Sequence, residues 1–171
     1  MRILGLDPGL RHTGWGVIEA QGSGLRFLDG GVVHSDADDL LADRLADLYR
    51  GLSGVIAGSG AVVAAVEETV VNRNPLSSLK LGHARGVVLL AASHAGLPVA
   101  EYASKQVKRS VTGTGAARKE QVALMVKVLL PSCRELAFDA TDALAVAICH
   151  AHVAATGSLV AAAARKAGVA S

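Results

Sequence analysis

Apolar and polar positions alternate along the first third of the chain, as they do in strands whose two faces differ. The alternation covers three segments, residues 2–7, 13–20 and 25–34. An Asp-Pro-Gly turn and a second turn containing Gly22 and Gly24 separate them. Short turns between successive strands predict an antiparallel meander of three strands.

The pattern then changes to helical spacing, with apolar residues four or three positions apart. These residues are Leu41, Leu45, Leu48, Leu52 and Val55. They predict an amphipathic helix over about 39–56, with Asp36 or Asp38 as its N-cap. The valine-rich run AVVAAVEE at 61–68 is typical of a buried strand that has helices on both faces.

The second half of the chain predicts more helices and one more strand. Asn74 and Pro75 are a cap and a first-turn proline, so a helix is expected from there to Gly96. PVAEY forms the fifth strand. Further helices are predicted at 104–111, with Ser104 as cap, at 117–130 and at 139–155.

This order of elements indicates one α/β domain over residues 1–156, with a five-stranded mixed sheet flanked by helices on both faces. Residues 157–171 have neither a cap nor a matching strand, so we expect a flexible C-terminal tail.

Composition narrows the class of protein. Apolar residues make up 51% of the 171, yet no run reaches the roughly 18 residues of a membrane span. The first residues lack the pattern of a secretory signal. Cys133 and Cys149 lie in apolar sequence without metal-site spacing, which indicates reduced core residues. We therefore expect a cytoplasmic protein that is not associated with a membrane.

Four carboxylates lie where distant elements could meet. Asp7 ends the first strand, Glu67 ends the fourth, and Asp139 and Asp142 lie one turn apart near the start of the last helix. If strands one and four are neighbours and the helix starts against their ends, all four converge. Such a group of anions requires cations, and Mg²⁺ suits carboxylate oxygens.

Two such ions, about 3.5–4 Å apart, would activate a water and stabilise the leaving oxygen of a phosphodiester. The set therefore predicts a nuclease. Taken singly, each residue has an ordinary interpretation: Asp7 as a turn former, and Asp139 and Asp142 as acids at the positive end of a helix dipole. Glu67 is harder to explain in this way, because a charge that closes an apolar strand needs a partner. The adjoining Glu68 could nevertheless be the exposed residue, and the pair could be simply a strand end.

Five blocks follow one another in a single order over residues 1–155: LGLDPGLRHTGWGV, AAVEE, SSLKLGHARGVVL, EYASKQVKRSVTGTGAARKEQV and DATDALAVAICHAH. Together they resemble the RuvC family of Holliday junction resolvases. The resemblance implies an RNase H-like fold and a structure-selective endonuclease that resolves four-way DNA junctions by paired symmetric nicks, in homologous recombination and DNA repair. It also implies two Mg²⁺ ions per active site, for which Mn²⁺ could substitute. The catalytic metal ligands would be Asp7, Glu67, Asp139 and Asp142.

Basic residues cluster on two successive predicted helices. Lys105, Lys108 and Arg109 lie on the first, and Arg118 and Lys119 open the second. Such a cluster can neutralise DNA phosphates, although many charge runs are simply solvated helix faces. The resemblance assigns junction binding and catalysis to Lys108 and Lys119, and we expect both to hold the scissile strand.

The segment TVVNRNP after Glu68 matches the family loop that reaches the point of strand exchange. Many relatives have an aromatic residue where this chain has Val70. Arg73 could supply a substitute contact, or it could be an ordinary exposed arginine.

The helix predicted from residue 75 has Gly82 and Gly86 four positions apart, so one of its faces is almost bare backbone. That face could pack inside the monomer. The resemblance implies instead a two-fold homodimer through this helix, and partnership with the RuvA and RuvB branch migration proteins.

Two other functions compete with this interpretation. Asp7, Gly9 and Gly14 also resemble the phosphate loop of actin- and hexokinase-like nucleotide-binding proteins, but 171 residues cannot hold their two domains. A module that binds junctions without cutting them is the other alternative, and the intact carboxylate set argues against it. The histidines at 12, 83, 94 and 150 are as compatible with structural roles as with catalysis.

Overall fold

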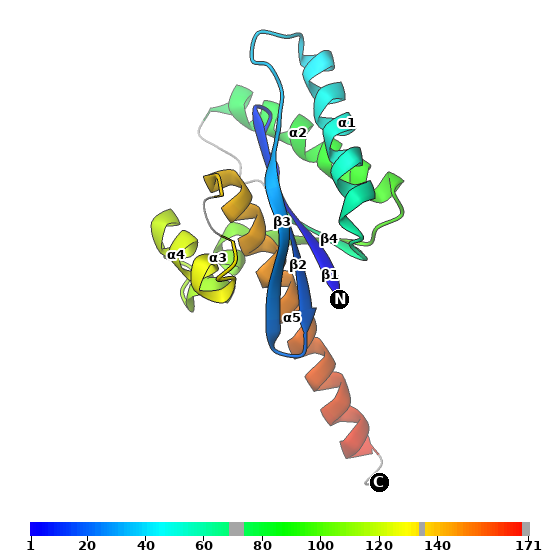
Figure 1. Cartoon of the computed structure of the whole chain (residues 1–171), viewed down its shortest axis with the longest axis vertical. Helices are drawn as coiled ribbons and strands as arrows, with labels where there is room; N and C mark the ends of the chain where they lie inside the picture. Colours follow the sequence, from blue (N-terminus) through cyan, green and yellow to red (C-terminus); the bar gives the residue numbers. More distant parts are fainter. Residues whose placement is uncertain (69–73, 134–135, 169–171) are drawn as a thin grey trace.

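The structure, a computed structural model, describes residues 1–68, 74–133 and 136–168, with side chains up to residue 157. A sheet lies between two layers of helices, and one long helix extends well beyond it (Figure 1). The strands are β1 (Arg2–Asp7), β2 (His12–Gln21), β3 (Gly24–His34), β4 (Val63–Glu68) and β5 (Val99–Ala103). The helices are α1 (Leu41–Ser59), α2 (Pro75–His94), α3 (Ser104–Thr112), α4 (Lys119–Leu129) and α5 (Phe138–Gly168).

Within the described residues the sheet has five strands in the order β3-β2-β1-β4-β5. β1 pairs antiparallel with β2 and parallel with β4, β2 pairs antiparallel with β3, and β4 pairs parallel with β5. The predicted meander and the mixed five-stranded sheet are therefore confirmed. The central strand, β1, carries Asp7 at its C-terminal end.

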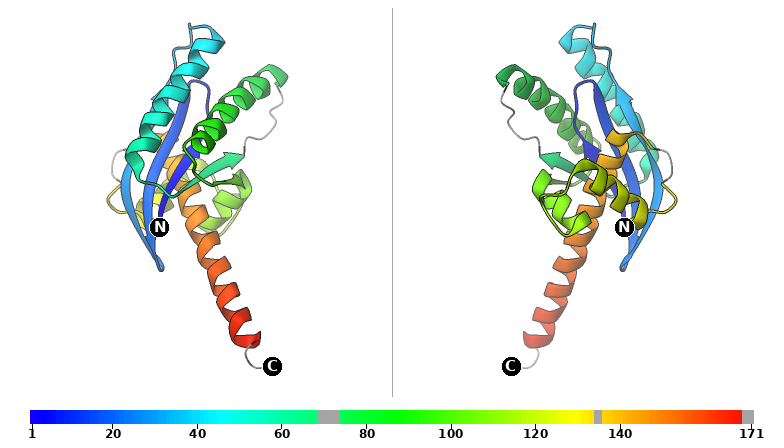
Figure 2. Two further views of the ribbon diagram at one scale, coloured as in Figure 1. Left: turned by 90° about the vertical axis from the view of Figure 1, so that its right-hand side faces the viewer. Right: turned by 90° about the vertical axis from the view of Figure 1, so that its left-hand side faces the viewer.

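Each face of the sheet has its own hydrophobic core. Ile3 of β1 packs with residues of α3, α4 and α5. Leu4 and Leu6 belong to the other core, which includes residues of α1 and α2. Figure 2 shows α1 and α2 on one side of the strands and α5 on the other. This arrangement confirms the prediction of helices on both faces.

Helix α5 lies against a strip of glycines on β1 and β2. A Cβ atom at Gly5 would lie 2.0 Å from the carbonyl oxygen of Ala143, and one at Gly16 would lie 2.5 Å from the side chain of Leu144. No larger residue fits at these positions without moving the helix away. The glycines therefore set how closely the start of α5 approaches the sheet.

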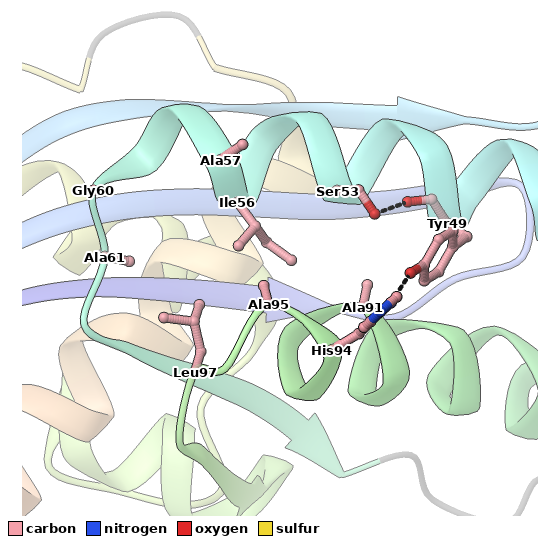
Figure 3. Close-up of a pocket in the computed structure, with 10 residues that line it drawn as sticks. All are labelled: Tyr49, Ser53, Ile56, Ala57, Gly60, Ala61, Ala91, His94, Ala95 and Leu97. Atoms are coloured by element: carbon pink, nitrogen blue, oxygen red, sulfur yellow. Dashed lines mark hydrogen bonds between the residues drawn. The ribbon is translucent and has the colours of Figure 1, made fainter.

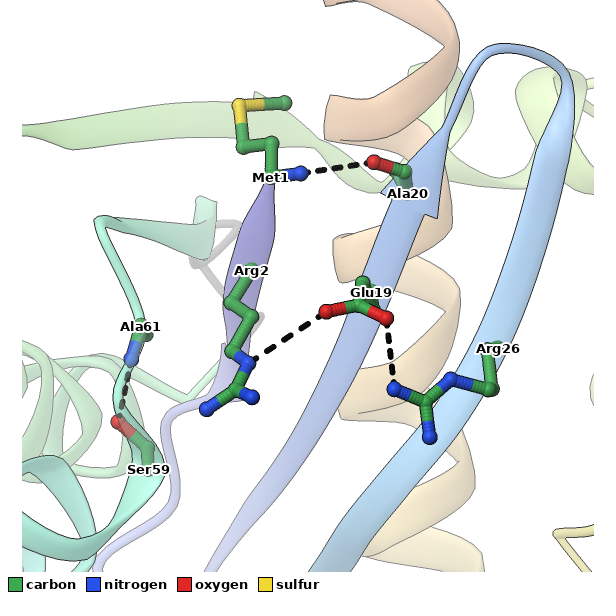
Figure 4. Close-up of polar contacts among 7 residues, drawn as sticks. All are labelled: Met1, Arg2, Glu19, Ala20, Arg26, Ser59 and Ala61. Carbon is green, nitrogen blue, oxygen red and sulfur yellow. Dashed lines mark hydrogen bonds and ion pairs between the residues drawn. The ribbon is translucent and has the colours of Figure 1, made fainter.

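Polar contacts secure the end of the meander opposite Asp7 (Figure 4). Glu19 on β2 lies between Arg2 on β1 (3.6 Å) and Arg26 on β3 (2.6 Å). The hydrogen bond from Arg26 and its charge hold the pKa of Glu19 below its usual range. The Met1 amino group donates a hydrogen bond to the Ala20 carbonyl oxygen at 2.8 Å. These exposed contacts define the register of β1 to β3 more than they stabilise the fold.

The predicted N-cap of the first helix is wrong. α1 begins at Leu41, and its N-cap position is Leu40, which has no side-chain cap bond. Asp36 instead accepts a hydrogen bond from the backbone N–H of Asp38 at 3.0 Å. This is a local turn, a structure that aspartate side chains favour as readily as a helix cap.

Of the other predicted helix boundaries, one is confirmed and two differ from the prediction. Asn74 caps α2 as predicted, because its side chain accepts hydrogen bonds from the backbone of Leu76 and Ser77. Ser104, however, is the first residue of α3 and not its cap. The last helix, expected to end near 155, continues to Gly168. The flexibility of residues 157–171 stays a prediction.

Both cysteines are buried and free, in agreement with their predicted place in the core. Among the described helices, none is both long and apolar enough to cross a bilayer.

Candidate active site

Asp7 and Glu67 lie side by side at one edge of the sheet because β1 and β4 are parallel neighbours. Leu6 pairs with Val66 in this ladder, so each carboxylate follows the last pair. Side chains alternate between the two faces of a strand. In β4, Val63 and Ala65 face the core that contains α5. Glu67 continues that series, and Glu68 points toward the opposite face.

The start of α5 brings the other two carboxylates to this edge. Gly14 pairs with Asp7 across β1 and β2, and a Cβ at Gly14 would lie 2.0 Å from the backbone oxygen of Asp139. One turn along the helix, Asp142 reaches the same place from above the sheet. Its carboxylate and that of Glu67 both raise the pKa of Asp7. The predicted convergence of these elements is present in the structure.

Three of the four carboxylates line one pocket of about 150 Å³. The lining residues are Asp7, Glu67, Ser104, Val107, Lys108, Lys119, Val122, Asp142 and Ala145. Asp139 is not among them, although its charge acts on Asp7. The pocket thus combines acidic residues from β1, β4 and α5 with lysines from α3 and α4.

The Asp7 carboxyl group is a much weaker acid than an exposed aspartate. Its pKa is raised from 3.8 to about 7, and removal from water is the largest cause. The negative charges of Glu67, Asp142 and Asp139 act in the same direction, and the positive charge of Lys119 opposes them. A buried acid beside other acids is costly to ionise unless a cation lies close to it.

Glu67 is in a similar position. Burial is the main cause that raises its pKa, and Asp142 adds to the effect. A hydrogen bond with Ser104 and the charges of Lys119 and Lys108 lower the pKa in part. Ser104 is therefore a residue of the site that the sequence suggested only as a helix cap. Its position directly after β5, the neighbour of β4, is the signal that could have revealed it.

Lys119 contacts the acidic group directly. Its Nζ lies 3.2 Å from Oδ2 of Asp142. The charge of Asp142, together with this hydrogen bond, raises the pKa of Lys119. The lysine thus supplies part of the positive charge that the carboxylates need.

The site fits a hard divalent cation, because the side chains that could bind one offer carboxylate oxygens. Within the described residues, no three acidic, histidine or cysteine side chains stand close enough to enclose an ion as they are placed. The ion pair with Lys119 directs the Asp142 carboxylate toward the lysine, and this contributes to the separation of the carboxylates. A bound cation would replace that partner.

A larger hollow lies elsewhere in the molecule, between the C-terminal parts of α1 and α2 (Figure 3). It measures about 480 Å³ and includes Ile56, Ala91 and Leu97. Its polar groups are mainly Ser53 and the hydrogen-bonded pair of Tyr49 and His94. Without a carboxylate or a lysine it offers nothing for phosphodiester chemistry, so the smaller pocket is the candidate active site.

Comparisons with known proteins identify the family. The family model described as crossover junction endodeoxyribonuclease RuvC matches residues 3–150. The chain belongs to the RuvC family. The RuvC protein of Paramagnetospirillum magneticum is 61% identical over 152 residues, which cover 89% of this chain and 92% of that relative. That of Methylocella silvestris is 57% identical over 159 residues, 93% of this chain and 90% of the relative.

Solved RuvC structures share the fold. The T. thermophilus RuvC in complex with a Holliday junction substrate superposes with a TM-score of 0.85 at 36% identity, over 92% of this chain and 96% of that one. A second Thermus thermophilus RuvC structure gives 0.82 at 37% identity, over 92% and 97% of the two chains. These matches confirm the predicted family, the RNase H-like fold and the enzyme class, a crossover junction endodeoxyribonuclease.

The other predicted DNA-binding residues of this RuvC chain lie in different places. Lys105, Arg109 and Arg118 are exposed and do not line the pocket. Val70 and Arg73 fall outside the described residues. The basic cluster of the sequence therefore divides into two lysines that line the pocket and three basic residues that do not.

The histidines contact groups other than the four carboxylates. His94 bonds to Tyr49, and His150 lies 2.8 Å from the Tyr102 hydroxyl. His83 is exposed, and His12 contacts His34. No described histidine lines the pocket, which argues against a role for these residues in the chemistry of the carboxylates.

Proposed function

We propose that this RuvC-family chain resolves four-way DNA junctions by paired symmetric nicks, in homologous recombination and DNA repair, with the pocket at Asp7 as its active site. The observation that supports this most is the meeting of three carboxylates from β1, β4 and α5 with two lysines in one small pocket. The carboxylates would bind cations, and the lysines would bind the phosphate between them.

Asp7, Glu67, Asp139 and Asp142 would hold two Mg²⁺ ions, with Mn²⁺ able to substitute. When bound, such ions supply a water activated for attack and stabilise the leaving oxygen. Membership of the RuvC family is in keeping with a metal requirement. Ser104 would orient Glu67, with which it shares a hydrogen bond.

Lys108 and Lys119 would hold the scissile phosphate over the carboxylates. Both line the pocket, and the Lys119 ammonium is already beside Asp142. An arriving phosphate offers Lys119 another anion. If Lys119 moved from Asp142 to the phosphate, the Asp142 carboxylate would be free to bind a cation. Binding of DNA and binding of metal would therefore support each other.

A synthetic four-way junction labelled on one strand tests the proposed function. With Mg²⁺ we expect nicks at symmetric positions of two opposite strands, and no nicks in linear duplex of the same sequence. With Ca²⁺, whose looser coordination suits this chemistry poorly, we expect binding without cleavage. Binding without cleavage in Mg²⁺ and Mn²⁺ would instead indicate a junction-binding module.

Replacing Lys108 or Lys119 with glutamine is expected to weaken junction binding and to lower the dependence of log Kd on log salt by about one for each lysine. Nicking should fall more than binding, because both side chains line the pocket. Electrophoretic mobility shifts over a series of salt concentrations measure the slope. Lys127→Gln is the matched control, since Lys127 is exposed on the same helix as Lys119 but does not line the pocket. An unchanged slope in both pocket variants would refute the proposed phosphate contact.

We further propose that the protein is a homodimer through α2. Gly82 and Gly86 are exposed, and apart from the neighbouring backbone of α2 no described heavy atom lies within 4 Å of a Cβ placed at either. Packing of this glycine face inside the described monomer is therefore excluded. Leu79 and Leu90, each 59% exposed, continue the same stripe at helical spacing. Two copies meeting there would bury the leucines and place two active sites on opposite strands.

Gly86→Arg is expected to convert the dimer to a monomer, because a large charged side chain would fill the proposed contact. The helix itself should not suffer, since arginine is a better helix former than glycine. Sedimentation velocity at micromolar concentration gives the oligomeric state. Gly54→Arg is the control: Gly54 is also exposed in mid-helix with open space around it, but on α1. A wild-type monomer, or a dimeric Gly86→Arg, would contradict this interface.

The remaining expectations concern partners and location. RuvA and RuvB as partners, contact of Val70 and Arg73 with the strand exchange point, DNA contacts of Lys105, Arg109 and Arg118, and a cytoplasmic location stay predictions from the resemblance and the sequence.

A further inference from the structure

Two histidines face each other on the adjacent strands β2 and β3. His12 and His34 are a directly opposite pair in this antiparallel ladder. Their Nδ1 atoms are 2.9 Å apart, and their rings stand at 85° with centroids 4.9 Å apart. Both side chains are exposed, and neither lines the carboxylate pocket. The pair is therefore an accessible site separate from the nuclease centre.

The distance between the two nitrogens restricts what can lie between them. Each neutral imidazole has one nitrogen with a lone pair, so a hydrogen or a metal ion must separate two Nδ1 atoms this close. With metal–nitrogen bonds of about 2.0 Å, two neighbouring ligands of a square-planar or tetragonal ion are about 2.8–2.9 Å apart, whereas tetrahedral ligands are about 3.3 Å apart. In the structure the two rings share a hydrogen bond of ordinary length, and this contact already holds the two nitrogens at the separation of the first geometry.

We propose that His12 and His34 form a two-imidazole chelate for a tetragonal transition-metal ion, of the class of Cu²⁺ or Ni²⁺. Imidazole is a preferred ligand of these ions. The exposure of both rings leaves the other coordination positions to water. Mg²⁺ prefers oxygen ligands and would remain at the carboxylates, so one chain would separate two kinds of cation by ligand chemistry.

The backbone around the pair holds it in place. Just beyond the two histidines, the backbone N–H of Ser35 donates to the Arg11 carbonyl oxygen at 3.2 Å, and the Ser35 hydroxyl donates to the Leu10 carbonyl oxygen. Arg44 donates to the Ser35 hydroxyl oxygen at 3.2 Å. The strand ends are thus fixed before any ion binds, which favours chelation by both rings at once. The nearby arginine charge opposes cations in general and leaves selectivity to the imidazoles.

Electron paramagnetic resonance of Cu²⁺ added to untagged protein tests the site. At one equivalent we expect an axial spectrum with superhyperfine coupling to two nitrogens. His12→Gln or His34→Gln should lose this pattern and bind Cu²⁺ about 100-fold more weakly, because one ring lacks the chelate effect. His83→Gln is the matched control, since His83 is exposed on α2, and it should keep the wild-type spectrum.

Thermal unfolding gives a second measurement that does not depend on catalysis. Ni²⁺ should raise the Tm of the wild type and of His83→Gln, and should leave the two site variants unchanged. The melting curves without metal should coincide for all four proteins, because the histidines are exposed. A two-nitrogen spectrum that survives in His12→Gln and His34→Gln, or oxygen-only coordination in the wild type, would overturn the proposal. Neither result depends on junction cleavage.

Discussion

Glu67→Gln is expected to abolish junction nicking, and Glu68→Gln to leave most of it. The two residues are neighbours in β4, but Glu67 lines the pocket and Glu68 is exposed on the other side of the strand. A glutamine keeps the shape of the side chain and removes the charge that binds a cation. Replacing a residue that only hydrogen-bonds to a metal ligand already lowers metal affinity or activity by about 10–100-fold. Replacing a ligand itself should therefore lower the nicking rate by more than about 100-fold. Single-turnover rates on a labelled junction in Mg²⁺ give the comparison.

Junction binding in Ca²⁺ serves as the control for this pair. Both variants should still bind the junction, because neither change removes a positive charge from the DNA-binding residues. Equal losses of activity in the two variants would mean that the end of β4 matters only as a structural element. Full activity of Glu67→Gln would remove β4 from the catalytic centre.

Asp7→Asn is expected to stabilise the metal-free protein at neutral and alkaline pH. The folded-state pKa of Asp7 is about 7, above its ordinary value of 3.8, mainly because the carboxyl group is buried. Between these two values the folded state keeps a proton that the unfolded state has lost. The free energy of unfolding of the wild type therefore falls as the pH rises from about 4 to 7. Asparagine does not ionise, so the variant escapes this loss.

The difference in stability should be near zero at pH 4, grow up to pH 7 and stay constant above it. Its upper limit corresponds to the full pKa shift, about 4 kcal/mol. Urea unfolding in EDTA at several pH values measures it, with the exposed Asp38→Asn expected to follow the wild type. Saturating Mg²⁺ should stabilise the wild type more than Asp7→Asn. A wild type that is more stable than Asp7→Asn at pH 8 in EDTA would contradict the electrostatic account.

The elements that build this site could be predicted from local patterns. The alternation in β1, β2 and β3, the apolar run of β4 and the Asn-Pro start of α2 each depend on short-range preferences, and the structure confirms them. The four carboxylates could be chosen from their places at the ends of two strands and the start of the last helix, and from the family resemblance. The structure adds the reason for Glu67 over Glu68, because residue 67 lies on the face that α5 covers.

The features of the site that could not be predicted depend on contacts between distant segments of the chain. The approach of α5 is set by Gly5, Gly14 and Gly16, which could be recognised as one strip only when β1 and β2 are in register. The hydrogen bond of Ser104 with Glu67 and the ion pair of Lys119 with Asp142 likewise join elements far apart in the chain.

The predicted cap at Asp36 or Asp38 failed for a local reason. Aspartate before a helix favours a turn or a cap with similar energy, and here the turn forms.

Junction cleavage depends, in this mechanism, on divalent ions held by Asp7, Glu67, Asp139 and Asp142. Anomalous scattering from crystals of the protein with a four-way junction, grown in Mn²⁺, locates such ions. We expect strong peaks between the C-terminal ends of β1 and β4 and the start of α5, absent from crystals of Asp7→Asn. Ordered junction DNA over this pocket without any Mn²⁺ peak beside Asp7, or with Mn²⁺ bound elsewhere, would refute the mechanism.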